Sequence, residues 1–486
     1  MSETQNPVIC WFRWDLRLQD NPALAAASAS GQPVICLYIY DDQSERLRPI
    51  GGASKWWLDK SLRKLGEDIA ARGGSILLRR GEAQSILDEV ISQTGANAVY
   101  WNRRYAPGER SLDETIKSGL KARGIDAKSF NGSLLTDPWT FKTGSGGHYR
   151  VFTPYWRAIQ ANYEAPSALP APKTLAKPDL LGDDLGTWDL HPTRPDWSTG
   201  FAPIWSPGET GAHQRLERFL DGAVSKYDEH RNRPDIDTGT SGLSPHLRFG
   251  EISPVQVWRA VQSLLQAGKV SREGAMTFLS EIAWREFSYV LLFHQEDLAE
   301  ENYNRGFDHM EWRDAPEDFD AWCKGETGFP IVDAGMRQLW QTGWMHNRVR
   351  MIVASFLTKH LLIDWRRGEK WFWDTLVDAD VAANPASWQW VAGSGADAAP
   401  YFRVFNPITQ GEKFDETGTY VTRYCPELMK IPKKFRYQPW EMKTEQARFT
   451  GIKLGETYPR PIVSHRLGRE RALDAYAIMK QRRDAT

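Results

Sequence analysis

The sequence predicts an α/β domain with a doubly wound parallel sheet, joined by a long linker to an all-α domain. Three observations predict this fold class. Short apolar runs alternate with helical patterns in the first third, a proline-rich stretch follows, and helical patterns then continue nearly to the end. The 486 residues exceed the roughly 250–300 at which one hydrophobic core stops growing. We therefore expect an α/β domain at 1–135, an interdomain linker at 136–207 and a helical domain at 208–486.

The first domain contains four runs typical of buried parallel strands, because they are short, apolar and rich in β-branched residues. Helical patterns separate them: an alanine-rich stretch opened by Asn21-Pro22, a run over 54–71 that ends at Gly73-Gly74, and a run around 86–91. Repeated βα units of this size imply a parallel sheet with helices on both faces. The expected strands are Val8–Phe12, Val34–Tyr40, 75–78 and 98–101.

Residues 165–207 hold eight of the 28 prolines and show no sustained periodicity. Proline stiffens a connector and prevents helix propagation, so this stretch is expected to join the domains. Beyond it the apolar spacing is helical. The expected helices are 211–226, 255–268, 273–294, 331–359, 370–377 and 466–481.

Composition excludes several classes of protein. The 61 basic and 62 acidic side chains give a net charge of −1, so nucleic acid binding would require a local basic patch. No uncharged apolar run reaches the roughly 18 residues of a membrane span, and the N-terminus lacks a secretory signal. The four separated cysteines fit a reducing compartment, so we expect a cytoplasmic protein, associated with the nucleoid if it binds DNA.

The stretch 238–245 combines hydroxyls and glycines before a helix start at Ser244-Pro245. In this interpretation the Ser244 hydroxyl caps the helix and the free N–H groups, hydroxyls and glycines cradle a phosphate. An ordinary helix cap is the alternative, because Ser253-Pro254 repeats the signature without the hydroxyl cluster.

One face of the expected helix 273–294 carries Glu281, Trp284 and Arg285 at i, i+3 and i+4. A carboxylate, an indole and a guanidinium together can hydrogen-bond, stack on and neutralise a nucleotide. The alternative is an i,i+4 salt bridge between Glu281 and Arg285 beside a core tryptophan.

Trp344, Asn347 and Met351 fall on one helical face, and Asn347 needs a hydrogen-bond partner if it is buried. His346 fits a structural role better than that of an acid or a ligand. Asp378 and Asp380 could suggest a metal, but no further ligand completes a shell, so no metal is expected.

The chain has 22 tryptophans. Most should pack in the core, although indoles also relay electrons and stack on bases. Many of them lie in the second half: Trp312, Trp322, Trp340, Trp344, Trp365, Trp371, Trp373, Trp388 and Trp390.

Together these segments resemble the photolyase/cryptochrome family, and cyclobutane pyrimidine dimer photolyases of the bacterial class I/III type most. The motifs lie at 11–22, 239–245, 284–287, 344–351 and 378–405. The resemblance implies an N-terminal α/β domain, a linker and a C-terminal helical FAD domain. It also implies a carbon–carbon lyase, in which excited, fully reduced FAD passes an electron to a pyrimidine dimer in DNA, the ring splits and the electron returns.

The resemblance assigns roles to residues of this chain. Arg350 would pair with Asp378 beside the isoalloxazine, and Asn384 would face flavin N5. The implied FAD set is Tyr227, Thr240, Ser241, Gly242, Leu243, Ser244, Arg285, Asn347, Arg350, Asp378, Ala379, Asp380 and Asn384.

Trp388, Trp365 and Trp312 would carry electrons from the surface to the flavin. A flipped-out dimer would enter a pocket formed by Glu281, Trp284, Asn347, Arg348, Met351 and Trp390. Arg231, Arg403 and Gln410 would contact DNA, the two arginines at phosphates, and a monomer is expected.

A few positions separate the branches of the family. Asn347 stands where six-four photolyases carry a second histidine, and Asn384 stands where cryptochromes usually carry Asp or Cys. Both favour dimer repair over a blue-light receptor that signals through FAD photoreduction, and over a flavoprotein that only binds DNA. Phe278 replaces a tryptophan of many relatives, which predicts weaker DNA binding.

The resemblance also implies a light-harvesting antenna. Glu109 matches a carboxylate that holds the pterin of 5,10-methenyltetrahydrofolate, which we favour over 8-hydroxy-5-deazaflavin. Trp56-Trp57 resembles a stretch near the antenna site, with helix packing as the alternative.

Overall fold

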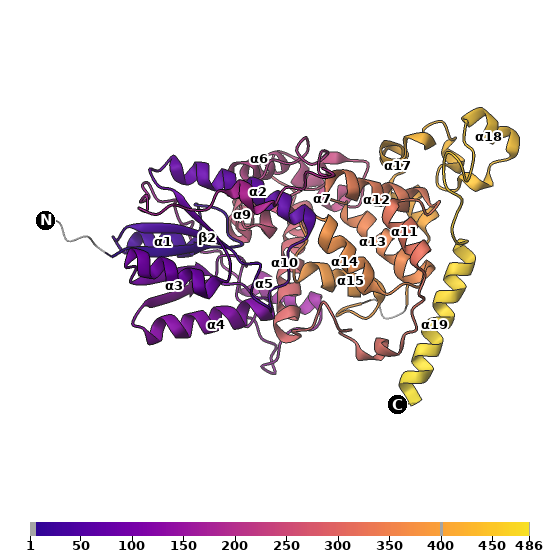
Figure 1. Cartoon of the computed structure of the whole chain (residues 1–486). Coiled ribbons are helices and arrows are strands. Elements are labelled where there is room, and N and C mark those ends of the chain that lie inside the picture. Colours follow the sequence, from indigo (N-terminus) through magenta and orange to yellow (C-terminus); the bar gives the residue numbers. More distant parts are fainter. Residues whose placement is uncertain (1–5, 399–401, 486) are drawn as a thin grey trace.

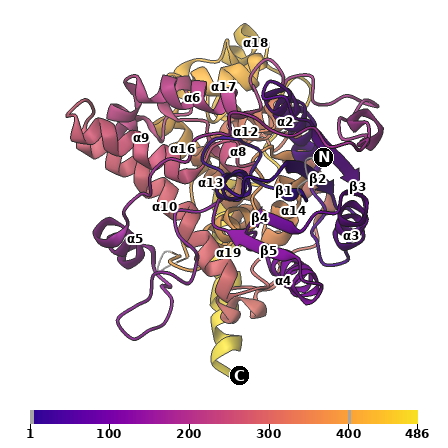
Figure 2. The ribbon, with the colours of Figure 1, turned by 90° about the vertical axis from the view of Figure 1, so that its left-hand side faces the viewer.

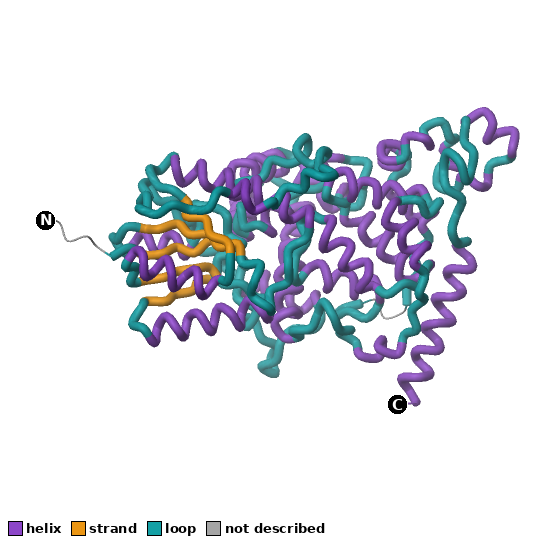
Figure 3. Tube along the Cα trace, in the orientation of Figure 1, coloured by secondary structure: helices purple, strands orange, loops and turns teal. Residues whose placement is uncertain are grey.

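The computed structural model describes residues 6–398 and 402–485. Its N-terminal part is one sheet of five parallel strands in the order β3-β2-β1-β4-β5, gathered at one end of the molecule (Figure 3). The central strand β1 pairs through Val8 with Val34 on one side and Ala98 on the other. The strands are β1 Val8–Phe12, β2 Val34–Tyr40, β3 Ile76–Arg80, β4 Ala98–Asn102 and β5 Asp126–Phe130.

Helices cover both faces of this sheet, because alternate residues of a strand point to opposite sides. Val8, Cys10 and Phe12 join a core with α1 and α2, whereas Ile9 and Trp11 join a second core with α3 and α4. The doubly wound arrangement is therefore confirmed. The helices are α1 Pro22–Ala29, α2 Gly52–Ala70, α3 Ala83–Thr94 and α4 Pro107–Ala122.

Strand β5 and helix α4 were not predicted from the sequence. β5 is an edge strand, and Ala127 is its only fully buried residue. A strand with one neighbour does not require the continuous apolar run by which the other four were recognised.

The expected linker 136–207 contains a helix, α5 Phe152–Asn162, and a 3₁₀ turn, Leu185–Trp188. α5 packs against the long helix α10 of the second domain. This segment therefore contributes to the helical domain as well as connecting the two parts, and its exact limits stay a prediction.

The second part of the chain is helical, and Figures 1 and 2 show it packed beyond the sheet, with α18 and α19 at the end of the molecule away from the sheet. Within the described ranges, every helix is too short or too polar to cross a bilayer. The helices are α6 Glu209–Leu220, α7 Tyr227–His230, α8 Ser244–Arg248, α9 Pro254–Gln266, α10 Arg272–His294, α11 Pro316–Lys324, α12 Pro330–Thr342, α13 Asn347–Ser355, α14 Trp365–Thr375, α15 Ala383–Ala392, α16 Pro407–Phe414, α17 Thr419–Tyr424, α18 Thr444–Thr450 and α19 His465–Ala485.

The single helix expected over 331–359 is wrong. α12 ends at Gly343, which has a φ of +66° and whose added Cβ would lie 2.7 Å from Val377 and 2.8 Å from Phe201. α13 begins after His346, whose Nδ1 accepts from the Arg348 amide, and it continues into a π-helical turn, Phe356–His360. A glycine C-cap followed by a side-chain N-cap breaks an otherwise continuous apolar pattern.

The sheet domain meets the helical domain where the N-terminus of α2 rests on α14. An added Cβ at Gly51 would lie 2.1 Å from the Trp373 carbonyl oxygen, so only glycine permits this approach. The Gly52 amide donates to Asp374 across 2.8 Å. This contact fixes the loop between β2 and α2 against the helices that carry the candidate site.

Candidate functional site

Asp378 is the buried centre of a polar cluster whose other members are half-buried or exposed. Its carboxylate accepts from the Ser244 hydroxyl across 2.6 Å and from Arg350 Nη2 across 2.8 Å. The Trp344 indole donates to the same hydroxyl across 3.3 Å. The cluster joins α8, α13 and the turn before α15, and it contains the Arg350–Asp378 pair expected from the sequence.

Ser244 does not cap its helix as expected. It is the first residue of α8, and no side-chain cap is formed there. Ser253 does cap α9, by accepting from the Gln256 amide across 2.9 Å. The Ser244 hydroxyl is instead directed to Asp378, and Ser244 is exposed, so a ligand could reach it.

The turn 378–383 is fixed between α8 and α10. Asp380 accepts from the amides of Ala382 and Ala383 and, across 2.8 Å, from the Tyr289 hydroxyl. The Ala379 carbonyl accepts from Arg248 Nε across 2.6 Å. These contacts fix the backbone of the turn for which the family resemblance implies a position along the cofactor.

Asn384, in the first turn of α15, is buried and oriented by one neighbour. Its Nδ2 donates to the Glu369 carboxylate across 2.9 Å and to the Glu369 carbonyl across 3.1 Å. Glu369 in turn accepts two bonds from Arg48, each of 2.8 Å. Neither Glu369 nor Arg48 was predicted from the sequence, because both interact with the site through contacts between distant segments.

The stretch before α8 supplies the hydroxyl-rich turn predicted as a phosphate cradle. Thr240 and Ser241 are half-buried, Leu243 is buried, and Gly242 has a φ of +61°. Tyr227 is buried nearby in α7, where its ring packs edge-on against Phe278 at 5.3 Å.

The three residues expected on one face of α10 contact different partners. Glu281 pairs with Arg231 at 2.7 Å, whereas Arg285 donates to the Ser133 carbonyl across 2.9 Å. The alternative pair, Glu281 with Arg285, is not formed. Burial raises the pKa of the Glu281 carboxyl, and Arg231 opposes part of that rise.

Trp284 and Trp390 both have a partner within the protein. Trp284 stacks on Phe152 with ring centroids 3.7 Å apart, and Trp390 donates to the Asp397 carbonyl across 3.1 Å. Both side chains are half-buried. Each indole is thus fixed in orientation and keeps part of its surface open to a ligand.

Other predicted DNA contacts lie on the surface of the helical domain. Arg348 donates to Asn232 across 2.8 Å and lies over the Phe414 ring at 4.5 Å. Asn347 and Arg403 are exposed, and Met351 and Gln410 are half-buried.

The predicted electron relay runs from buried to partly exposed indoles. Trp388 is 3% exposed and Trp365 is fully buried, with its Nε1 bonded to Asn302, whereas Trp312 is half-buried. Trp365 and Trp388 belong to one buried hydrophobic cluster, and Trp312 packs against that cluster. The Trp322 ring packs edge-on against Trp388, with the ring centroids 6.2 Å apart.

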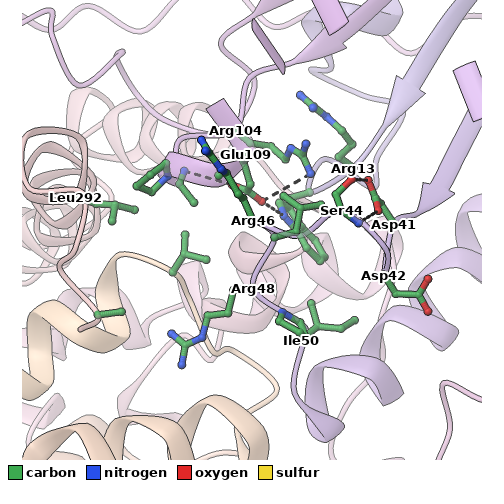
Figure 4. Close-up of a pocket in the computed structure, with 18 of the residues that line it drawn as sticks. Arg13, Asp41, Asp42, Ser44, Arg46, Arg48, Ile50, Arg104, Glu109 and Leu292 are labelled. Atoms are coloured by element: carbon green, nitrogen blue, oxygen red, sulfur yellow. Dashed lines mark hydrogen bonds and ion pairs between the residues drawn. The ribbon is translucent and has the colours of Figure 1, made fainter. Parts of the chain in front are cut away.

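A separate cavity of about 320 Å³ lies at the carboxyl ends of β1 and β2, beside the point where the strand order reverses (Figure 4). Ligands of open α/β sheets bind at such switch points. Glu109 lines it and accepts from the Trp14 indole across 2.9 Å. Trp56 and Trp57 are buried in the sheet core outside the cavity lining, so the helix-packing interpretation is the correct one.

The sequence and the fold of this chain are similar to those of known proteins. The chain matches the model of DNA photolyase over residues 8–173 and that of the FAD binding domain of DNA photolyase over residues 278–478. The deoxyribodipyrimidine photo-lyase of Agrobacterium fabrum is 52% identical over 99% of this chain and 100% of its own. The structure of a bacterial class III photolyase from Agrobacterium tumefaciens matches with a TM-score of 0.96 at 52% identity, covering 99% of each chain.

A cryptochrome is less similar: cryptochrome-1 of Arabidopsis thaliana is 36% identical over 97% of this chain and 70% of its own length. Because a five-stranded α/β domain is joined to a helical FAD-binding domain, the chain is a two-domain flavoprotein. Within that class, the chain belongs to the DNA photolyase family.

The described residues fit an FAD. Its pyrophosphate requires hydrogen-bond donors, and Thr240 and Ser241 offer hydroxyls on one short turn, whereas the Ser244 hydroxyl donates to Asp378. Its isoalloxazine requires a polar partner at N5, and Asn384 presents an oriented amide. The Arg350 guanidinium adds positive charge beside the Ser244 hydroxyl.

Proposed function

We propose that the chain repairs cyclobutane pyrimidine dimers in DNA with light, as a deoxyribodipyrimidine photo-lyase. The observation that carries the proposal is the cluster of Ser244, Arg350 and Asp378 next to the oriented amide of Asn384, in a chain similar over its full length to bacterial photolyases. FAD in its reduced form, when bound, supplies the electron that splits the dimer.

The protein residues position the cofactor. The 240–244 turn would hold the pyrophosphate through its hydroxyls and amides, and Arg285 and Asn347 would complete the predicted set. Arg350, held by Asp378, would place positive charge beside the isoalloxazine. Asn384 would accept a hydrogen bond from N5 through Oδ1, since both of its amide hydrogens are held by Glu369.

The lesion would leave the duplex and enter between half-buried aromatic side chains. Flipping costs a few kcal/mol, least for a damaged pair. Trp284 and Trp390 would offset this by stacking, at about 1–3 kcal/mol per base. Glu281 would hydrogen-bond the dimer and stabilise the charge that develops on it. Arg231 and Arg403 would bind phosphates, and Arg348, Met351 and Gln410 would shape the pocket and its rim.

The repair reaction is tested with the purified protein, chemically reduced and illuminated with blue light, on an oligonucleotide that carries one thymine dimer. We expect the dimer to be lost under light and retained in the dark. Retention under light, with reduced FAD bound, would favour the second candidate, a blue-light receptor. The 36% identity to cryptochrome-1 motivates that candidate. Asn384 argues against it, because cryptochromes usually carry Asp or Cys at this position.

We further propose a folate antenna, 5,10-methenyltetrahydrofolate, in the cavity that Glu109 lines, with 8-hydroxy-5-deazaflavin as the alternative. The cavity supports the proposal because it combines a carboxylate for a pterin ring with aromatic walls such as Trp14 and Tyr40. The absorption spectrum of the purified protein separates the two pigments. Glu109→Ala should remove the antenna band and leave the flavin bands intact.

A monomer, located in the cytoplasm with the nucleoid, is proposed on the grounds of the sequence alone. Size-exclusion chromatography with light scattering tests the monomer, and fluorescence microscopy of a tagged chain tests the location.

A further inference from the structure

Arg48 connects the sheet domain to the centre of the helical domain. It lies on the loop between β2 and α2 and lines the cavity at the carboxyl ends of the strands (Figure 4). Its two terminal nitrogens each donate to one oxygen of Glu369 in α14, both across 2.8 Å. The Glu369 side chain is only 2% exposed, whereas that of Arg48 is 30% exposed. Arg48 and Glu369 therefore form a bidentate ion pair between the wall of the cavity and the core of the helical domain.

The same carboxylate fixes the orientation of an amide. Glu369 Oε1, which accepts from Arg48, also accepts from Asn384 Nδ2 across 2.9 Å, and the second amide hydrogen is directed to the Glu369 carbonyl across 3.1 Å. An ionised carboxylate can only accept, so it holds the NH₂ group of Asn384 toward itself. The Oδ1 atom is thereby left to accept from elsewhere.

Arg48 is held in place before any ligand binds. Its guanidinium lies over the Trp373 ring at 3.8 Å, and the Trp373 indole donates to the Pro49 carbonyl across 2.8 Å. The close approach of Gly51 to Trp373 anchors the next turn of the loop. Arg48 is thus pre-organised, which lowers the entropic cost of holding Glu369.

We propose that Arg48 is a positioning residue that holds the Glu369 carboxylate in place, and through it keeps Asn384 turned with Oδ1 toward the flavin. The proposal rests on the FAD placement of the proposed function. A reduced flavin carries hydrogen at N5 and needs an acceptor there, whereas an oxidised flavin carries a bare N5 and needs a donor. Through Arg48, the loop between β2 and α2 therefore favours the reduced flavin over the oxidised flavin.

Removing Arg48 takes away the two hydrogen bonds that fix the Glu369 carboxylate and leaves that buried group without its cation, which is costly. A carboxylate that is no longer fixed releases the NH₂ group of Asn384, and the amide can then turn that group to N5. That orientation favours the oxidised flavin.

The test is Arg48→Met, with the bound FAD reduced and its reoxidation in air followed in the dark by absorbance. We expect unchanged FAD occupancy and about tenfold faster reoxidation, about the size of one hydrogen bond between uncharged groups. Arg48→Lys keeps the positive charge and the aliphatic stem but loses the two-nitrogen guanidinium group. Its reoxidation rate should lie between those of the wild type and Arg48→Met. Arg80→Met is the matched control, because it removes a surface arginine–carboxylate pair with Asp42 in the same domain, and it should reoxidise like the wild type.

Equal reoxidation rates in Arg48→Met and the wild type, with FAD bound in both, would overturn the proposal. If Arg48→Met loses FAD, Arg48→Lys decides: faster reoxidation than in the wild type supports the proposal, and an equal rate overturns it. None of these measurements uses damaged DNA. Failure of the wild type to repair dimers would therefore count against the proposed function without changing this result.

Discussion

Arg231, the residue after α7, forms an ion pair with Glu281 of α10, with Nη1 and Oε1 2.7 Å apart. Each was predicted from the sequence for a separate task, Arg231 for a DNA phosphate and Glu281 for the dimer. In the proposed function, this pair would couple the two tasks. A phosphate that draws Arg231 away would leave the half-buried Glu281 carboxylate without its cation, and a hydrogen bond from the lesion would then compensate it.

Replacing Glu281 with alanine tests its role in repair. We expect the repair yield per absorbed photon to fall about tenfold, the size of one hydrogen bond to a charged group, with FAD still bound. The measurement is dimer loss under calibrated light, together with the flavin spectrum. Glu273→Ala, an exposed position in the first turn of the same helix, is the control. An unchanged yield in Glu281→Ala would remove Glu281 from the mechanism.

Replacing Trp388 with phenylalanine tests the electron relay. The buried indole would be the first to reduce the excited oxidised flavin, so the variant should show no photoreduction under blue light with an external reductant. Trp390→Phe, on the same helix, should still photoreduce. Persistent photoreduction in Trp388→Phe would mean that another indole route exists, and Trp322 would then be the next position to replace, because it packs against Trp388.

Adding a methyl group at Gly368 tests the packing around Trp388. An added Cβ would lie 2.1 Å from the Trp388 ring and 2.7 Å from Leu357. Gly368→Ala should therefore lower the free energy of unfolding by about 1–3 kcal/mol through overpacking. Gly119→Ala, in α4 with no atom within 4 Å of the added Cβ, should instead raise it by about 0.5–1 kcal/mol. Denaturant titration measures both, and equal effects would contradict the packing argument.

Acid should destabilise the fold through His360. Burial, His465 and Arg471 lower the pKa of His360 from 6.5 to about 3. Below about pH 6.5 the unfolded chain therefore binds a proton at His360, whereas the native chain does not. The free energy of unfolding is unaffected by this histidine above that pH and decreases as the pH falls toward 3.

At about pH 5 the loss from this one histidine is about 2 kcal/mol. His360→Phe should lose less stability than the wild type between neutral pH and about pH 5, as measured by denaturant titration at each pH. His309→Asn should keep the wild-type dependence. An identical acid dependence in His360→Phe and the wild type would show that His360 is not the group responsible.

Local sequence patterns predicted most of the helices and strands, and local motifs predicted the family. The apolar runs predicted four of the five strands, and Asn21-Pro22 predicted the start of α1, where Asn21 accepts from the Leu24 amide. The pattern failed where local signals were weak or competed. β5 has too little burial to show an apolar run, and the break after α12 depends on a glycine in the left-handed region.

The sequence by itself determined which residue types meet at the candidate site, because motifs such as 344–351 and 378–405 carry the hydroxyl, amide, acid and indole groups in order. Only the tertiary structure decided their partners. Ser244 could have capped a helix and Glu281 could have paired with Arg285, since both alternatives satisfy local geometry. Contacts between distant segments selected Asp378 and Arg231 instead, and they brought Arg48 to Glu369. Long-range packing sets these pairs because a buried charge is stabilised by whichever opposite charge the fold places beside it.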